Sequence, residues 1–174
     1  MISALRCAPF ALALCAVQSH TPDAAAEGAR FERALKATGL ACEASASGLS
    51  FKVAFEHEHG RSQTVFASVE AARPGGLILH TIYTTVWVDL QMPPGEELLR
   101  KVLTKTKKFG SFYLFRVEPN RWAVRFGTDF DATDLPETSK AGDALVRRLR
   151  DTIEFVDRVG EETDVELNGE TDVR

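Results

Sequence analysis

The sequence predicts an α+β domain in which three helices cover one face of a five-stranded antiparallel sheet, in the order α-β-β-β-α-β-β-α. Several short runs alternate apolar and polar residues with the period of a half-buried strand, and turn motifs rather than long crossovers join most of them. With 174 residues and 44% hydrophobic content, the chain can form one domain with its own core. That length excludes a TIM barrel or a two-domain enzyme.

The first residues have the layout of a secretory signal peptide, covering residues 1–19. One basic residue, Arg6, precedes an apolar run at residues 7–17, and a polar segment follows. The run of 11 residues is too short to span a bilayer, which takes roughly 20 apolar residues. We therefore expect an exported protein, periplasmic or extracellular, without stable membrane insertion and with a linker at residues 20–30. The alternative is a cytoplasmic protein whose first helix is buried.

The first half of the domain is predicted to be one helix followed by a hairpin. Residues 31–38 carry an apolar stripe at helical spacing, and Gly39 ends the helix. Residues 49–55 alternate apolar and polar side chains, a turn follows at residues 59–61, and residues 64–69 return. We expect these two strands to pair antiparallel.

The middle of the chain contains its most strand-like segment, at residues 77–90. Both faces of this segment are apolar or β-branched, which is typical of a central strand. A Pro-Pro-Gly turn ends the strand, and the acidic residues Glu96 and Glu97 open a helix that ends at Gly110.

The last part of the domain is predicted to be a second hairpin and a helix. Strands at residues 112–117 and 122–126 flank a Glu-Pro-Asn-Arg turn. Asp134 and Glu137 resemble a capping box, so we expect the last helix to follow them and to end at Gly160.

Acidic residues are concentrated at the carboxyl end. Residues 160–174 hold six acids and one base without apolar periodicity, so we expect a disordered acidic tail. Residues 20–159 hold 19 bases and 19 acids, a neutral balance that argues against nucleic acid as a partner.

Four segments resemble a known family: LKATGL at residues 35–40, MPPGEELL at 92–99, FGSFYLF at 109–115 and IEFVDRV at 153–159. Together with the hairpins, they make residues 31–159 similar to YbjN-like bacterial proteins, which share a fold with type III secretion chaperones. The resemblance implies a non-enzymatic binding domain with a chaperone-like or regulatory role, often dimeric.

Few residues suggest chemistry. His57 and His59 would lie about 7 Å apart on one face of an extended strand, close enough to share a metal if a third ligand came from elsewhere, but they also suit a solvated hairpin tip. His80 lies in an apolar run, where a histidine is usually a core or edge residue. Cys42 suits a small packed side chain. We therefore expect no catalytic residue, metal or cofactor.

An interaction surface is the remaining prediction. Three helices do not hide both faces of the sheet, so either Tyr83 and Trp87, or Ile82 and Val86, are expected on an exposed face that binds a second copy or a client. The alternative is that the aromatic residues of the strands pack in the core. A basic stripe on the second helix has two readings, an interaction surface or a solvated face paired with acids such as Glu97. The candidate surface therefore comprises Tyr83, Trp87, Lys101, Lys105 and Lys108. We expect a homodimeric module that binds a protein or polypeptide, with an exported small-ligand or metal-binding domain as the alternative.

Overall fold

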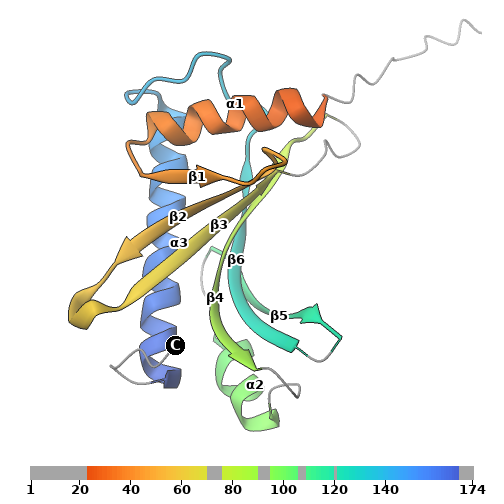
Figure 1. Cartoon of the computed structure of the whole chain (residues 1–174), viewed down its shortest axis with the longest axis vertical. Coiled ribbons are helices and arrows are strands. Elements are labelled where there is room, and N and C mark those ends of the chain that lie inside the picture. Colours follow the sequence, from red (N-terminus) through yellow and green to blue (C-terminus); the bar gives the residue numbers. More distant parts are fainter. Residues whose placement is uncertain (1–22, 70–75, 90–94, 106–108, 120, 169–174) are drawn as a thin grey trace, which may run out of the picture.

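The computed structural model describes residues 23–69, 76–89, 95–105, 109–119 and 121–168. The predicted signal peptide lies outside these residues. The elements are α1 (Ala24–Ala37), β1 (Cys42–Ala44), β2 (Ser50–Glu56), the 3-10 turn η1 (Glu58–Gly60), β3 (Ser62–Val69), β4 (Leu79–Asp89), α2 (Glu96–Leu103), β5 (Ser111–Glu118), β6 (Arg121–Asp131) and α3 (Ala144–Asn168). Figure 1 shows their arrangement.

The strands form one antiparallel sheet in the order β1-β2-β3-β4-β6-β5. The α+β class and three helices are confirmed within the described residues, and both predicted hairpins are present. The expected number of five strands is wrong, because β1 adds a sixth at the edge of β2. This strand has three residues, too few for alternation to reveal it in the sequence.

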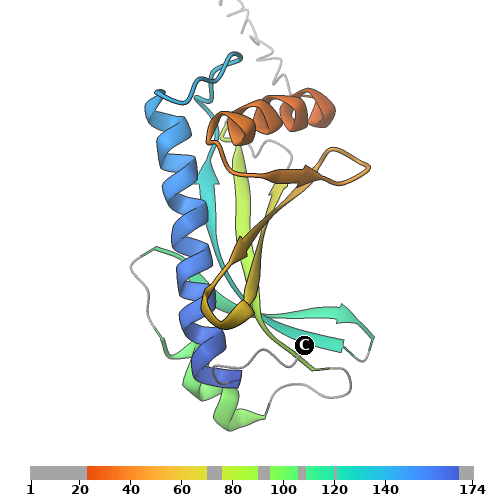
Figure 2. The ribbon, with the colours of Figure 1, turned by 60° about the vertical axis from the view of Figure 1, so that its left-hand side comes forward.

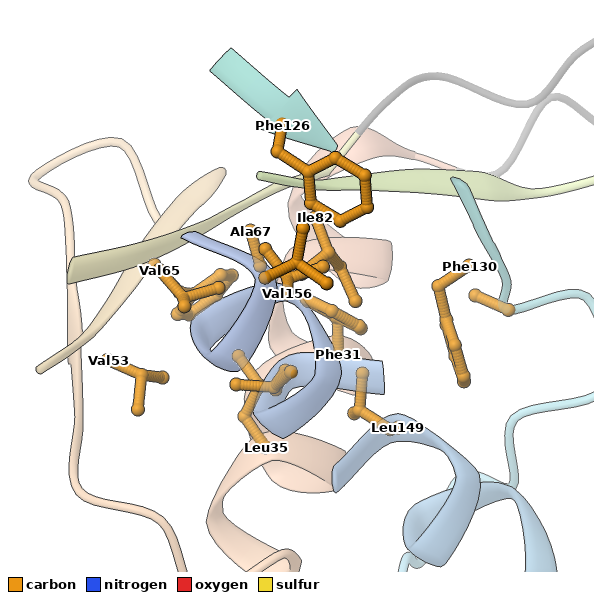
Figure 3. Close-up of a cluster of buried hydrophobic side chains, with 14 of the residues drawn as sticks. Phe31, Leu35, Val53, Val65, Ala67, Ile82, Phe126, Phe130, Leu149 and Val156 are labelled. Atoms are coloured by element: carbon orange, nitrogen blue, oxygen red, sulfur yellow. The ribbon is translucent and has the colours of Figure 1, made fainter. Parts of the chain in front are cut away.

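The helices α1 and α3 lie on the same face of the sheet. Alternate residues of β4 are fully buried, from His80 through Ile82 and Thr84 to Val86, so one face of the central strand is covered along most of its length. Figure 2 shows α3 running along this face while α1 crosses its upper end. Figure 3 shows the side chains between them, including Phe31, Leu35, Ile82, Leu149 and Val156.

The first helix begins earlier than predicted. Residues 24–30 are helical, so the expected linker at residues 20–30 is wrong over that stretch. The carboxylate of Asp23 accepts a hydrogen bond from the backbone N–H of Ala25 at 3.1 Å and caps the helix. Glu27 is buried on the first turn of α1 although it is a charged residue. A charged residue at a buried position interrupts the apolar periodicity from which the helix would be predicted.

The start of α3 also differs from the prediction. Asp134 and Glu137 lie in the loop before the helix, which begins only at Ala144, so the expected capping box is wrong. Glu137 instead pairs with Arg33 of α1 at 3.1 Å. The carboxylate of Asp143 accepts a hydrogen bond from the backbone N–H of Lys140 at 2.8 Å and orders the turn that precedes the helix.

The acidic segment is helical as far as the structure describes it. α3 continues past Gly160 to Asn168, so the predicted stop at Gly160 and the disorder expected over residues 160–168 are wrong, while residues 169–174 lie outside the described part. Charge pairs hold this segment. Arg61 is only 3% exposed and pairs with Glu161 at 2.8 Å and with Asp164 at 2.6 Å. Such partners, about 100 residues apart in the chain, leave no periodic signal in the sequence.

Gly160 lies where α3 crosses β4. A Cβ atom there would stand 2.4 Å from Cγ2 of Thr84 and 3.0 Å from Nε2 of Gln63, both well inside ordinary contact. Thr84 and Gln63 are buried, so neither side chain has open space to retreat into. Glycine at this position therefore sets how closely the helix approaches the sheet.

We predict that Gly160→Ala lowers the thermal midpoint, because overpacking a filled site costs roughly 1–3 kcal/mol. The matched control is Gly142→Ala, since a Cβ at Gly142 meets nothing within 4 Å. Thermal unfolding of both variants checks this. If Gly160→Ala raised the midpoint, as alanine does in an unhindered helix, the close contact with Thr84 would be contradicted.

Candidate interaction face

We call the face of the sheet opposite α1 and α3 the open face. A row of three aromatic rings and one arginine crosses it. The row comprises Phe66 of β3, Tyr83 of β4, Arg125 of β6 and Phe115 of β5. The rings of Phe66 and Tyr83 are stacked, with centroids 5.4 Å apart. The guanidinium carbon of Arg125 lies 4.4 Å from the centroid of the Tyr83 ring and 3.9 Å from that of Phe115. Four strands thus share one continuous cation–π and stacked surface.

Strand register places the row on this face. Phe66 lies directly opposite Tyr83 in the ladder, and Thr85, two residues further along β4, lies opposite Arg125. Side chains two residues apart in a strand point to the same face, so Tyr83 and Arg125 belong to one surface. The intervening residue Thr84 is fully buried on the covered face.

A groove of about 360 Å³ runs beside the row. Its lining includes two arginines but no aspartate or glutamate. The lining residues are Ser62, Gln63, Thr64, Phe66, Tyr83, Thr85, Val117, Arg121, Ala123 and Arg125.

The row ends at an edge strand. β5 occupies one end of the strand order, and within the described residues its outer side pairs with no other strand (Figure 1). Phe115 is 41% exposed and Val117 is 40% exposed, so apolar side chains accompany the unpaired backbone groups. Such an edge is a template for pairing with another chain. No motif predicted this surface, because its residues come from four strands.

The predicted aromatic pair, Tyr83 and Trp87, is divided between the two faces. Tyr83 belongs to the open face, whereas Trp87 packs against the buried core. The cause is a register shift between Thr85 and Trp87, where β4 bulges against β6. The expectation that one alternating set would be exposed together is therefore wrong for Trp87. Ile82 and Val86, the other set, are both fully buried.

Two lysines of the predicted basic stripe form ion pairs with a carboxylate of the same chain. Lys101 lies 3.7 Å from a carboxylate oxygen of Glu166, and Lys105 pairs with the same carboxylate. Lys108 lies outside the described residues. The partner is thus the end of α3 rather than Glu97, and these lysines connect α2 to α3.

The two hairpin histidines do not share a strand face. β2 ends at Glu56, and His59 lies in the η1 turn with a φ of 62°. Nε2 of His57 lies 3.0 Å from a carboxylate oxygen of Asp157 on α3. Burial raises the pKa of Asp157, and the hydrogen bond with His57 opposes that rise. Among the described residues, no group of three His, Cys, Asp or Glu side chains is placed to hold a metal ion.

His80 belongs to a polar cluster under α1. Its Nε2 lies 3.0 Å from Oε1 of Glu27, and Arg30 donates to the same carboxylate at 2.9 Å. Arg30 also donates to the carbonyl oxygens of Leu135 and Ala132, so the cluster connects α1, β4 and the loop after β6. These partners were not predictable from a sequence pattern, because Glu27 and Arg30 lie in the segment predicted as a linker.

No family model matches the chain, and no curated protein matches it either. None of the described helices is both long and apolar enough to cross a membrane. The fold and the open face define an α+β domain that is packed by helices on one side of its sheet and presents rings and arginines on the other.

We predict that Glu27 makes the fold sensitive to acid. Burial alone would raise the pKa of Glu27, but hydrogen bonds from His80 and Arg30, together with their charges, outweigh it and hold the pKa below its ordinary value. Because the folded pKa is lower than the unfolded one, the stability from Glu27 is present above the unfolded pKa and lost as the pH falls through the folded pKa.

Urea unfolding at several pH values between 7 and 3 measures this loss. Glu27→Gln is expected to lower stability at pH 7 and to flatten its decline in acid. The control is Glu137→Gln, since the Glu137 side chain is 82% exposed in its pair with Arg33. If the free energy of unfolding fell equally with decreasing pH in the parent protein and in Glu27→Gln, the Glu27 carboxylate would not be the cause of the acid sensitivity.

Proposed function

We propose that the protein is a non-enzymatic, protein-binding module, chaperone-like or regulatory, that forms a homodimer and captures a polypeptide client. The observation that carries this proposal is the open face, where the row from Phe66 to Phe115 ends at the unpaired edge of β5. Aromatic and arginine side chains dominate the energetics of protein interfaces, and this surface presents both in contact with each other.

The geometry suits an extended partner. Backbone N–H and C=O groups of the β5 edge can pair with an added strand, while the side chains of that strand cover Phe115 and Val117. The sheet beneath is held rigidly by the helices on its other face, so binding requires little ordering of this chain. A second copy and a client both fit this description, because each supplies a strand or an apolar side chain.

Two further points support the proposal. The succession of helices and strands, apart from the added β1, is the order predicted from the sequence, and four segments of that sequence resemble YbjN-like proteins. His80 is fully buried and bonded to Glu27, which keeps its ring from reaching a substrate and favours a non-enzymatic role. Export, with loss of residues 1–19, belongs to the same proposal and is checked by the mass of the mature chain.

We predict a dimer by light scattering that Phe115→Glu and Tyr83→Glu convert to a folded monomer. Each change places a charge on the row without entering the core. Ala141→Glu is the matched control, because Ala141 is exposed in the loop before α3 and does not belong to the sheet. Ile82→Glu is expected to unfold the protein, since Ile82 is fully buried and a buried charge without a partner costs several kcal/mol.

Circular dichroism of each variant shows whether it is folded. A parent protein that stays monomeric at all concentrations would contradict the dimer. If Ala141→Glu disrupted the dimer as strongly as Phe115→Glu, the interface would lie elsewhere on the molecule.

A further inference from the structure

The groove beside the row carries positive charge without a countercharge. Arg121 and Arg125 line it, and the other lining side chains are hydroxyl, amide, aromatic or aliphatic groups. In the part of the chain that the structure describes, neither arginine forms an ion pair. Arg30, Arg33, Arg61, Arg100 and Arg150 each pair with a carboxylate of the chain, whereas the described residues Arg116, Arg147, Arg148 and Arg158 do not. Arg121 and Arg125 differ from both groups because each combines the absence of an ion pair with a buried Nε that has no partner in the described structure.

The Nε–H groups of the two groove arginines have no hydrogen-bond acceptor in the described part of the chain. Nε of Arg121 and Nε of Arg125 are both buried, and neither has a partner among the described residues. Arg125 lies over the rings of Tyr83 and Phe115, and its guanidinium group also forms a hydrogen bond with the Tyr113 hydroxyl. Rings stabilise a cation but accept hydrogen bonds weakly, so the guanidinium groups favour an incoming anion.

The apolar lining restricts what that anion is attached to. Phe66, Tyr83, Val117 and Ala123 line the same groove, so an occupant places an apolar group beside its anionic one. Carboxylates match the planar guanidinium group through paired hydrogen bonds. The β5 edge extends the site beyond the groove and offers backbone groups that a small anion leaves unused.

We propose that this groove selects acidic segments of polypeptide, in which glutamate or aspartate side chains flank an aromatic or aliphatic residue. The carboxylates pair with Arg121 and Arg125, and the apolar side chain packs against Phe66 and Tyr83. This inference rests on the proposed function and adds the chemistry of the client.

Fluorescence anisotropy with three labelled peptides tests the inference on the full chain. The peptides share their length and two phenylalanines and differ at the flanking positions, which are glutamate, glutamine or lysine. The glutamate peptide is expected to bind at least about tenfold more tightly than the glutamine peptide, with an affinity that falls as salt rises, and the lysine peptide more weakly than both.

Substitutions of the groove arginines test whether the preference for the glutamate peptide comes from the groove. Arg121→Gln and Arg125→Gln are each expected to weaken the glutamate peptide about tenfold and to leave the glutamine peptide unchanged. Arg125→Lys keeps the charge but not the paired hydrogen bonds, so it is expected to lie between, and it replaces Arg125→Gln if that variant unfolds. Arg158→Gln is the control, because it removes the same charge from an exposed site on α3.

The outcomes separate this inference from the proposed function. Equal binding of all three peptides, or an acidic preference that survives both glutamine variants, would overturn the inference and leave the binding module intact. Binding of none would overturn the capture of polypeptides itself. If free glutamate displaced the peptide at concentrations comparable to the peptide's own dissociation constant, the groove would be a small-anion site and the polypeptide assignment would be wrong.

Discussion

The close crossing of α3 over β4 at Gly160 and Thr84 is the contact on which the arrangement of the molecule depends. Because the helix approaches the sheet so closely there, Leu149, Ile153 and Val156 reach the core from one side of α3 and are fully buried. α1 fills the rest of the same face with Phe31 and Leu35 (Figure 3). With both long helices on one side, the rings of the other side have no helix above them in the described structure.

Buried charges then determine where each helix attaches. Arg61, at the turn between β2 and β3, binds Glu161 and Asp164 of α3, and Glu27 of α1 binds His80 of β4. Buried ion pairs add little net stability compared with apolar residues, but removing one partner leaves a costly unpaired charge. These pairs therefore penalise alternative placements of α1 and α3. The groove arginines stand apart from this pattern, and their missing countercharge is what suggests an external partner.

Sequence patterns predicted those elements whose burial follows a regular period. Alternation located β2, the turn after it located β3, and a run of apolar and β-branched residues located β4; turn residues located the second hairpin. The register shift before Trp87 was not predictable, because a bulge leaves the residue pattern unchanged while moving the side chain to the other face. The helical acidic segment depends on Arg61, which is distant in sequence. Of the open face, the sequence analysis named Tyr83, whereas Phe66, Phe115 and Arg125 could be grouped with it only from the strand order.

The proposed association places the contact on the open face and not on the face covered by α1 and α3. Hydroxyl-radical footprinting of the dilute monomer and of the associated protein measures this residue by residue. We predict that Tyr83 and Phe115 are oxidised in the monomer and protected on association, while the buried Phe51 and Phe130 remain unreactive in both states. Unchanged oxidation of Tyr83 and Phe115, with new protection confined to α3, would contradict this placement.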